Sequence, residues 1–257
     1  MAGPTTARRG TGQQQDEPAR PPRPTRRRLL TVITVGVLLL VSGSVWALYG
    51  SSWFRAEQVT TTGVDVLTPA EVEAAAAVPI GAPMVSVDTD AIADRLRQKL
   101  PRIDSVDVVR SWPHGIGLKV TERKPVLLMK KDTKFIEVDV EGVRFATVDR
   151  APKRVPLLEL TPDQSASLRR FGSGRLVREA VRVAGELPVA VAKDTRVVRV
   201  TSYDSISLEL TGDRTVVWGS GEEGPVKARV LTALMKAAPK AGHFDLSAPT
   251  APAVSGS

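Results

Sequence analysis

The 257-residue chain contains no cysteine and only two histidines, His114 and His243. Without cysteine it has no disulfide framework, no thiol chemistry and no Cys/His zinc site. Two histidines leave almost no choice of base for Ser/His/Asp catalysis. The motifs G-x-S-x-G, G-x-x-x-x-G-K-[ST] and H-E-x-x-H are also absent. We therefore expect a protein that is not an enzyme and that uses no metal or cofactor.

Paired carboxylates are the remaining candidates for acid–base chemistry. Asp88 and Asp90 stand where a helix is expected to begin, and carboxylates at that position cap free backbone N–H groups. Asp104 and Asp107 fall beside or within a β-rich run, where they are expected to be surface charges. Both pairs are therefore assigned structural roles.

The formal net charge of +8 is unevenly distributed along the chain. Residues 1–28 contain seven arginines against Asp16 and Glu17, so they carry +5 of this charge. They are rich in Pro, Gln, Thr and Gly, and so bury too little apolar surface to offset the entropy of ordering. We expect a disordered basic tail. It has no aromatic or structured nucleic-acid reader, so no nucleic-acid partner is predicted.

Residues 29–49 form an uncharged apolar run, which predicts a transmembrane helix. As a helix the run spans roughly 30 Å, the thickness of a bilayer core. Arg26, Arg27 and Arg28 precede it, and basic residues of this kind favour the cytoplasmic side. Trp46 and Tyr49 lie at the other end, where amphipathic rings prefer the membrane interface. The pattern indicates a single-pass type II protein with a cytoplasmic N-terminus and an extracytoplasmic body.

A cleaved signal peptide is the main alternative to an anchor. The stretch from Thr25 to Leu30 even resembles a twin-arginine export signal. However, the apolar run is longer than the roughly 7 to 15 residues of a signal core, and no A-x-A cleavage site follows it. Retention as a membrane anchor is therefore favoured.

A first exported domain is predicted over residues 53–124. A β-rich run ends at Gly63, and the capping box Thr68-Pro69-Ala70-Glu71 then begins a helix. Asp88 is the expected N-cap of a second helix. Two β-rich runs then flank Trp112-Pro113-His114-Gly115, which predicts an antiparallel hairpin. The expected order is β-α-α-β-β.

Short fragments of this domain occur in a fixed order. They are Val59-x-x-x-Gly63, Gly81-x-Pro83-Met84, Asp88, Leu100-Pro101-x-Ile103, Val106-x-Val108-x-Arg110-x-Trp112-Pro113 and Val120-x-Glu122-Arg123-x-Pro125. In this order they resemble the POTRA domain of the FtsQ (DivIB) family of bacterial cell-division proteins. The Glu-Arg-x-Pro run after the hairpin and the preceding anchor make the resemblance specific. An unrelated small α+β module is the alternative.

A second exported domain is predicted over residues 125–247, followed by a flexible tail over 248–257. Short β-prone runs alternate with an amphipathic helix closed by Pro188 and another beginning at Pro225. The run Val138-Asp139-x-x-Gly142-Val143-x-Phe145 is similar to the start of the β domain in the same family. The expected fold class is α+β, with an antiparallel β domain and flanking helices.

Residues 219–224 match the dinucleotide pattern G-x-G-x-x-G between a strand and a helix. Glu222 and Glu223 would face the pyrophosphate that such a loop must attract, and too little chain follows for a doubly wound sheet. A dinucleotide site is therefore not predicted.

The resemblance implies a scaffold of the division machinery that recruits the FtsB/FtsL (DivIC/FtsL) coiled-coil pair and, through it, septal peptidoglycan synthesis. In that family the last strand and the helix before it receive the FtsB-like partner. A terminal edge strand can accept such a partner by β-augmentation. The alternative is that Phe244 and Leu246 fill the core while the chain itself covers the edge. By position the site residues are Lys227, Val230 and Leu234 on the helix and His243, Phe244, Asp245 and Leu246 on the strand.

The resemblance also implies a septal location and contacts with other division proteins of the membrane, without a small-molecule substrate. Two other functions stay open at this point. A POTRA-bearing export or assembly factor would bind unfolded polypeptide or a β-barrel. A tethered cell-wall hydrolase or transferase would need a nucleophile or carboxylate dyad, and no candidate stands out.

Overall fold

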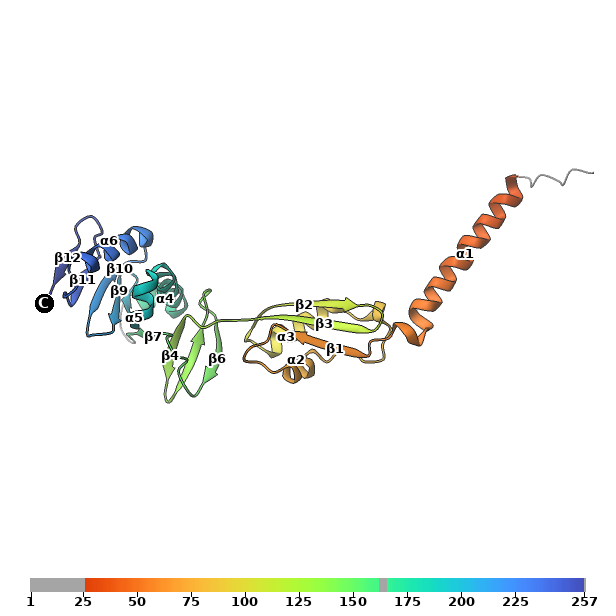
Figure 1. The fold of residues 1–257 in the computed structure, drawn as a ribbon, viewed down its shortest axis with the longest axis horizontal. Coiled ribbons are helices and arrows are strands. Elements are labelled where there is room, and N and C mark those ends of the chain that lie inside the picture. Colours follow the sequence, from red (N-terminus) through yellow and green to blue (C-terminus); the bar gives the residue numbers. More distant parts are fainter. Residues whose placement is uncertain (1–25, 162–165, 257) are drawn as a thin grey trace, which may run out of the picture. The chain divides into compact units, whose positions relative to one another are not determined.

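The computed structural model describes residues 26–161 and 166–256 (Figure 1). The chain divides between Phe54 and Arg55 into an N-terminal unit with one long helix and a body with all the strands. Residues 1–25, which make up most of the predicted basic tail, lie outside the described residues.

Helix α1 (Arg26–Gly50) contains the whole predicted span, and no residue of it is buried by the rest of the protein. The hydroxyl groups of Thr31, Thr34 and Ser44 donate to carbonyl oxygens one turn earlier, at 2.8–2.9 Å. The helix thus satisfies these polar groups internally, as a bilayer requires. Within the described residues, α1 is the one helix long and apolar enough to cross a membrane.

The first half of the body has the predicted β-α-α-β-β order. Its three strands form a sheet in the order β1-β3-β2, in which β1 runs parallel and β2 antiparallel to β3. The 3-10 turn η1 (Ser52–Phe54) precedes this sheet, and η2 (Met84–Ser86) joins its helices. The elements are β1 (Gln58–Thr62), α2 (Pro69–Ala76), α3 (Thr89–Lys99), β2 (Ile103–Ser111) and β3 (Gly115–Glu122).

Both helices of this half begin where the sequence predicts. The Thr68 hydroxyl accepts a hydrogen bond from the Glu71 N–H at 3.2 Å, and the Glu71 carboxylate accepts one from the Thr68 N–H at 2.8 Å. These bonds favour the ionised carboxylate and lower the pKa of Glu71. Asp88 accepts hydrogen bonds from two backbone N–H groups, at 3.1 and 3.0 Å. Its predicted role as a cap is confirmed.

The helices pack against the three-stranded sheet through a small apolar core. Ile92 and Leu96 of α3 are spaced one helical turn apart, and Ile116 and Leu118 of β3 are spaced two residues apart. These spacings place each pair on one face of its element. All four side chains are at most 2% exposed, together with Val72 of α2.

The second half of the body is a nine-stranded sheet in the order β12-β11-β10-β9-β8-β7-β4-β5-β6. Helices α4 (Ala166–Glu186), α5 (Val189–Asp194) and α6 (Gly224–Ala237) accompany it. The strands are β4 (Leu127–Lys131), β5 (Lys134–Val138), β6 (Arg144–Val148), β7 (Leu157–Leu160), β8 (Thr195–Ser202), β9 (Ser205–Leu210), β10 (Thr215–Gly219), β11 (His243–Asp245) and β12 (Ala253–Ser255).

The nine-stranded sheet is mixed, not purely antiparallel as predicted. β7 pairs parallel with both β4 and β8, and β10 pairs parallel with β11. Helices α4 and α5 connect β7 to β8, and α6 connects β10 to β11. Such helical crossovers return the chain in the same direction, which makes the joined strands parallel. The predicted α+β class and the flanking helices are confirmed.

Two elements of this half were not expected from the sequence. Pro188 closes α4 as predicted, but it is also the N-cap residue of α5. The expected flexible tail over 248–257 is wrong at residues 253–255, because these form strand β12 on β11. Pro252 stands directly before β12, and an edge strand tolerates proline at its start.

Ion pairs join the two sheets of the body. Arg102, next to the start of β2, contacts Glu137 of β5 at 2.5 Å, and its guanidinium lies 5.2 Å from the ring centroid of Phe145. Arg123, after β3, bonds Asp139, which is 3% exposed. Burial opposes the charge on Arg123, yet the Asp139 carboxylate raises its pKa. Asp104 also pairs with Arg123 at 3.2 Å and so has a structural role.

Candidate partner-binding site

Strand β11 is not a free edge, which corrects the expectation from the sequence. It pairs in parallel with β10 on one side and antiparallel with β12 on the other (Figure 1). The register places His243 opposite Ser255 and Phe244 opposite Val254. The chain itself therefore covers the edge that was expected to receive a partner.

Three of the seven predicted contact residues are buried in the protein's own interior. Phe244 and Leu246 are 1% and 0% exposed and belong to the core of the nine-stranded sheet. Lys227 is 2% exposed. A partner cannot reach these side chains without opening the fold, so their burial does not support the predicted role in partner binding, which stays a prediction.

The other four predicted residues are partly buried. Val230 and Leu234 of α6 pack against the same core. His243 Nδ1 lies 2.8 Å from the hydroxyl of Thr215 on β10. Asp245 accepts hydrogen bonds from the N–H and hydroxyl of Ser247 at 2.9 and 2.7 Å, and these lower its pKa. Each of these side chains thus has a structural role.

The free edge at this end of the sheet belongs to β12. Within the described residues, no strand pairs with its outer side. The Gly242 N–H donates to the Gly256 carbonyl oxygen at 3.1 Å. The Thr215 N–H donates to the Gly242 carbonyl oxygen and the Leu246 N–H to the Val217 carbonyl oxygen, both at 2.8 Å, so the parallel pairing turns the backbone groups of Phe244 toward β10. Successive residues alternate, so His243 and Asp245 face Ser255 and Ala253 of β12, and the backbone groups of Val254 face outward. Val254 thus presents a backbone donor and acceptor to solvent.

An open depression of ≈ 480 Å³ adjoins this edge. Its lining combines β12 with the turn at residues 238–241 that follows α6. Val254 packs partly into the core, whereas Ala253, Ser255 and Lys240 are exposed. We name the outer edge of β12 together with this turn the β12 edge site. A short β strand with side chains for the depression fits this geometry.

The signal for β12 in the sequence is weak. It has three residues, Ala, Val and Ser, of which only Val254 is β-branched. A strand of this length shows no clear alternation of apolar and polar residues. Pro252 before it and Gly256 after it are the best local signs of a short edge strand.

Side chains of the protein itself occupy the space within and beside the glycine loop at residues 219–224. Lys227 Nζ donates hydrogen bonds to the carbonyl oxygens of Trp218 and Ser220, at 2.9 and 2.7 Å. A Cβ added at Gly221 would lie 1.9 Å from Glu179 Oε1, and one at Gly224 would lie 1.7 Å from Glu186 Oε2. These glycines therefore make room for carboxylates of α4. Carboxylates at this position oppose the approach of a pyrophosphate.

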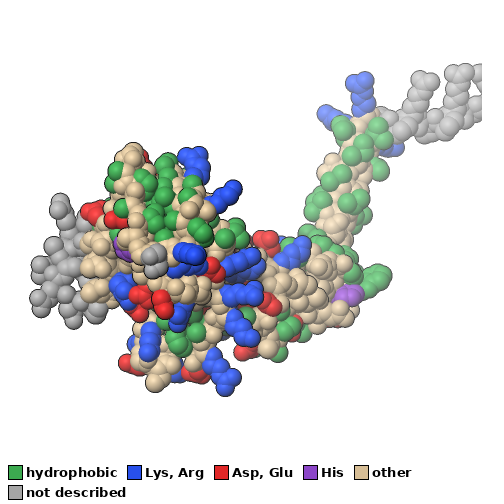
Figure 2. Space-filling model, turned by 60° about the vertical axis from the view of Figure 1, so that its left-hand side comes forward, with side chains coloured by type: hydrophobic (Ala, Val, Ile, Leu, Met, Phe, Trp, Pro, Cys, Tyr) green, Lys and Arg blue, Asp and Glu red, His purple; other side chains and the backbone are tan. Residues whose placement is uncertain are grey.

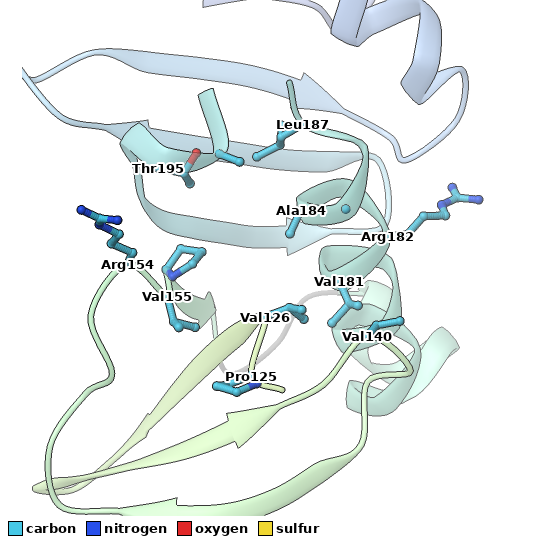
Figure 3. A pocket seen from close by; sticks show the side chains of 13 residues that line it. Pro125, Val126, Val140, Arg154, Val155, Val181, Arg182, Ala184, Leu187 and Thr195 are labelled. Carbon is cyan, nitrogen blue, oxygen red and sulfur yellow. The ribbon is translucent and has the colours of Figure 1, made fainter. Parts of the chain in front are cut away.

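The body also has an apolar surface cavity of ≈ 360 Å³ beside α4 (Figure 3). Val126, Val155 and Val181 point into it, and Arg154 and Arg182 point away at its sides. The hydroxyl of Thr195 already donates to the Val191 carbonyl oxygen at 2.8 Å. The lining thus contains no acid, base or nucleophile arranged for a reaction.

Charges of both signs are interspersed on the face of the body shown in Figure 2, so this face is not a polyanion-binding patch. The same view shows basic side chains at one end of the apolar helix α1. Arg26, Arg27 and Arg28 form the first turn of that helix, and the exposed rings of Trp46 and Tyr49 lie in its last turns. Their order along the helix is that expected for a membrane anchor. Within the described residues, no group of His, Asp and Glu is placed to hold a metal ion.

Comparison with known proteins gives one consistent result. The family described as "POTRA domain, FtsQ-type" matches residues 54–123. "Cell division protein FtsQ" of Streptomyces venezuelae is 65% identical, with 100% of this chain and 99% of that protein covered. "Cell division protein FtsQ" of Streptomyces coelicolor is 64% identical, with 100% of both chains covered. A structure of the major extracytoplasmic domain of DivIB from Geobacillus stearothermophilus gives a TM-score of 0.34 at 15% identity, over 46% of this chain and 94% of that one.

Proposed function

The chain belongs to the FtsQ family of bacterial cell-division proteins, and from this premise we propose that it is a non-catalytic membrane scaffold of the division machinery. The observation that carries the proposal is the similarity over the full length, which includes the anchor, the POTRA domain and the β domain. A scaffold agrees with a body that offers an exposed strand edge and an apolar cavity without catalytic groups.

The proposed topology places the N-terminus in the cytoplasm and the body outside. Support comes from the three arginines at the start of α1 and the aromatic residues at its end. A reporter enzyme that is active only outside the cytoplasm, fused after residue 257, should be active. The same reporter fused before residue 1 should be inactive. The reverse pattern would exclude this topology.

We propose that the FtsB-like and FtsL-like division proteins of the same organism bind at the β12 edge site. The partner would add one strand to β12, with backbone hydrogen bonds giving affinity and the depression beside residues 238–241 selecting side chains. This proposal replaces β11 by β12 as the receiving strand, because β11 is paired on both sides. Other division proteins of the membrane are proposed partners of the remaining surface.

Val254→Pro is the most informative variant for this site. Proline removes the outward N–H of residue 254 and places its ring on the free edge, while Ala253 and Ser255 keep the backbone groups that face β11. Val254→Ala keeps the N–H and is the matched control for the lost side chain. We expect co-purification of the FtsB-like and FtsL-like proteins to be lost in Val254→Pro alone, with similar melting temperatures for the two variants. Retained binding by a folded Val254→Pro chain would exclude the β12 edge.

The location of the protein in dividing cells tests the proposed scaffold function. A fluorescent protein fused to the N-terminus should label the division septum as a band, and its signal should fall when the FtsB-like partner is depleted. A uniform signal around the membrane would favour an export or assembly factor. Release of fragments from purified peptidoglycan by the full-length protein would favour a cell-wall enzyme. Either result would contradict the proposal.

A further inference from the structure

One end of the POTRA domain collects the chain arriving from the membrane helix and two exposed apolar loops. Residues Ala56 and Glu57, just before β1, hold both loops through the backbone. The Gly81 N–H donates to the Ala56 carbonyl oxygen at 2.7 Å, and the Glu57 N–H donates to the His114 carbonyl oxygen at 2.9 Å. The loop at residues 79–82 and the hairpin turn at residues 112–114 therefore lie at the same end. We call them together the POTRA tip.

The POTRA tip has two large apolar side chains that are exposed to solvent. Ile80 is 60% exposed and Trp112 is 50% exposed. An exposed indole ring favours the headgroup region of a bilayer, because its N–H can contact water or headgroups while its apolar part contacts the acyl chains. The opposite end of the sheet offers a comparison. The backbone N–H of Val66, at that end, donates to Glu122 at the end of β3, and the aliphatic Val66 side chain is 62% exposed.

Basic groups accompany these apolar side chains. Arg55 Nη1 donates to the Gly81 carbonyl oxygen at 2.7 Å, and Arg110 donates to the carbonyl oxygens of Met84 and Val87 at 3.0 and 2.6 Å. Each guanidinium keeps further N–H donors for a phosphate oxygen. Glu57 lies in the same group and Asp88 directly follows Val87, so the basic and acidic side chains are equal in number. The remaining guanidinium donors, together with the exposed apolar side chains, suit the phosphate oxygens and apolar boundary of a lipid headgroup layer.

The length of the chain limits how far the POTRA tip can lie from the bilayer. Gly50 ends α1, and Glu57 is already bonded to the hairpin turn. Seven residues of fully extended chain reach at most about 25 Å. The 3-10 turn η1 shortens that reach, because each residue of such a turn rises only about 2 Å. This limit follows from the connection alone.

We propose that the POTRA tip, through Trp112 and Ile80, rests in the headgroup layer of the outer face of the membrane. The lipid surface is then a second binding partner, separate from the protein partner at the β12 edge site. The inference rests on the membrane anchor of the proposed function. It adds that the first exported domain is held at the bilayer by its own side chains as well as by the anchor.

The absence of cysteine makes the test direct. Single cysteines at Trp112, Ile80 or Val66 in the full-length chain can each be labelled with the fluorophore NBD. The labelled chains are reconstituted into phosphatidylglycerol/phosphatidylcholine vesicles that contain spin-labelled phosphatidylcholine, and flotation selects the membrane-bound protein. We expect strong quenching and a blue-shifted emission at positions 112 and 80, and several-fold weaker quenching at position 66. Because positions 112 and 80 are labelled in separate variants, the test still works if one of the two variants does not fold.

A measurement without a label completes the test. Brominated lipid quenches tryptophan, so Trp112→Phe should reduce the quenched part of the intrinsic emission if Trp112 meets the lipid. Equal and weak quenching at all three labelled positions, in protein that floats with the vesicles, would overturn the inference and leave the anchor intact. Equal strong quenching would also overturn it, because the domain would then lie along the membrane. If the labelled protein did not float with the vesicles, both the proposed membrane anchor and this inference would be contradicted.

Discussion

Lys227 donates a hydrogen bond of 2.7 Å from Nζ to the carbonyl oxygen of Ser220, although its side chain is 2% exposed. The same ammonium group bonds the Trp218 carbonyl oxygen at 2.9 Å. Burial lowers the pKa of Lys227, and the nearby carboxylates of Glu223, Glu222 and Glu186 oppose that effect. A lysine at the start of α6 thus closes the loop between β10 and α6, next to the strands that carry the β12 edge site.

Replacing Lys227 by methionine should destabilise the protein, because two carbonyl oxygens lose their donor. The expected loss is about 1–3 kcal/mol of unfolding free energy, the cost of leaving buried polar groups unpaired. Chemical denaturation of the full-length protein in detergent measures it. Lys236→Met, on the exposed side of the same helix, should change the stability little. Equal unfolding free energies for Lys227→Met and Lys236→Met would show that the two hydrogen bonds of Lys227 do not stabilise the fold.

Glu186 should make the stability depend on pH. Burial raises its pKa, helped by Glu179 and opposed by Arg182 and Lys227, and its Oε2 has no hydrogen-bond partner. A carboxyl group with a raised pKa in the folded state contributes stability below its unfolded pKa of about 4.3 and loses it as the pH rises through the folded value. Glu186→Gln should therefore raise the melting temperature at pH 7 and flatten its decline from acidic to neutral pH. The exposed Glu222→Gln variant should follow the unaltered protein.

Gly63→Ala should be much more damaging than Gly81→Ala, although both glycines have φ near +80°. An added Cβ at Gly63 would lie 2.0 Å from the backbone oxygen of Val120. Among the described residues, apart from the two chain neighbours of Gly81, no atom would lie within 4 Å of a Cβ added there. The left-handed conformation alone costs roughly 1–2 kcal/mol for a residue with a Cβ. We expect about that loss for Gly81→Ala and at least ~3 kcal/mol for Gly63→Ala, because backbone must also move. Thermal unfolding of both variants measures the two losses of stability. Equal losses would contradict the proposed clash at Gly63.

Arg123→Ala should weaken the junction of the two sheets. It removes the charge partner of Asp139, which is 3% exposed and also accepts bonds from the N–H groups of Glu141 and Val143. Removing one partner of a buried ion pair costs about 3–5 kcal/mol of unfolding free energy. We expect about 3 kcal/mol for Arg123→Ala, because Arg123 is partly exposed. Arg199→Ala is the matched control, since Arg199 also contacts two carboxylates but is 41% exposed. Its loss should stay below about 1 kcal/mol, and similar losses in both variants would contradict the difference.

The elements that the sequence predicts well are those with complete local signals. The helix after Thr68 has a capping box, and the hairpin around Trp112 has turn residues between two β-rich runs. The apolar run before Gly50 needs no tertiary information at all. Such signals are local, so they survive in any fold that contains the segment.

The sequence predicts less where tertiary pairing decides the outcome. Strand β12 has only three residues, and its pairing with β11 depends on the turn that brings it back from Leu246. The direction of β7 and β11 within the sheet depends on the crossover helices, which local pattern does not reveal. The free edge of the sheet therefore lies one strand beyond the strand that the sequence indicates. The burial of Lys227 is equally hard to predict, because lysine is rarely buried without partners that only the folded loop supplies.

Among the described residues, β12 is the last strand along the chain, and this order has a consequence for folding. The outer edge of β11 stays unpaired until residues 253–255 have been synthesised, because β12 is the strand that covers it. An unpaired strand edge is a template for pairing with other chains. The late arrival of β12 therefore leaves β11 open to such contacts until the end of the sheet has formed.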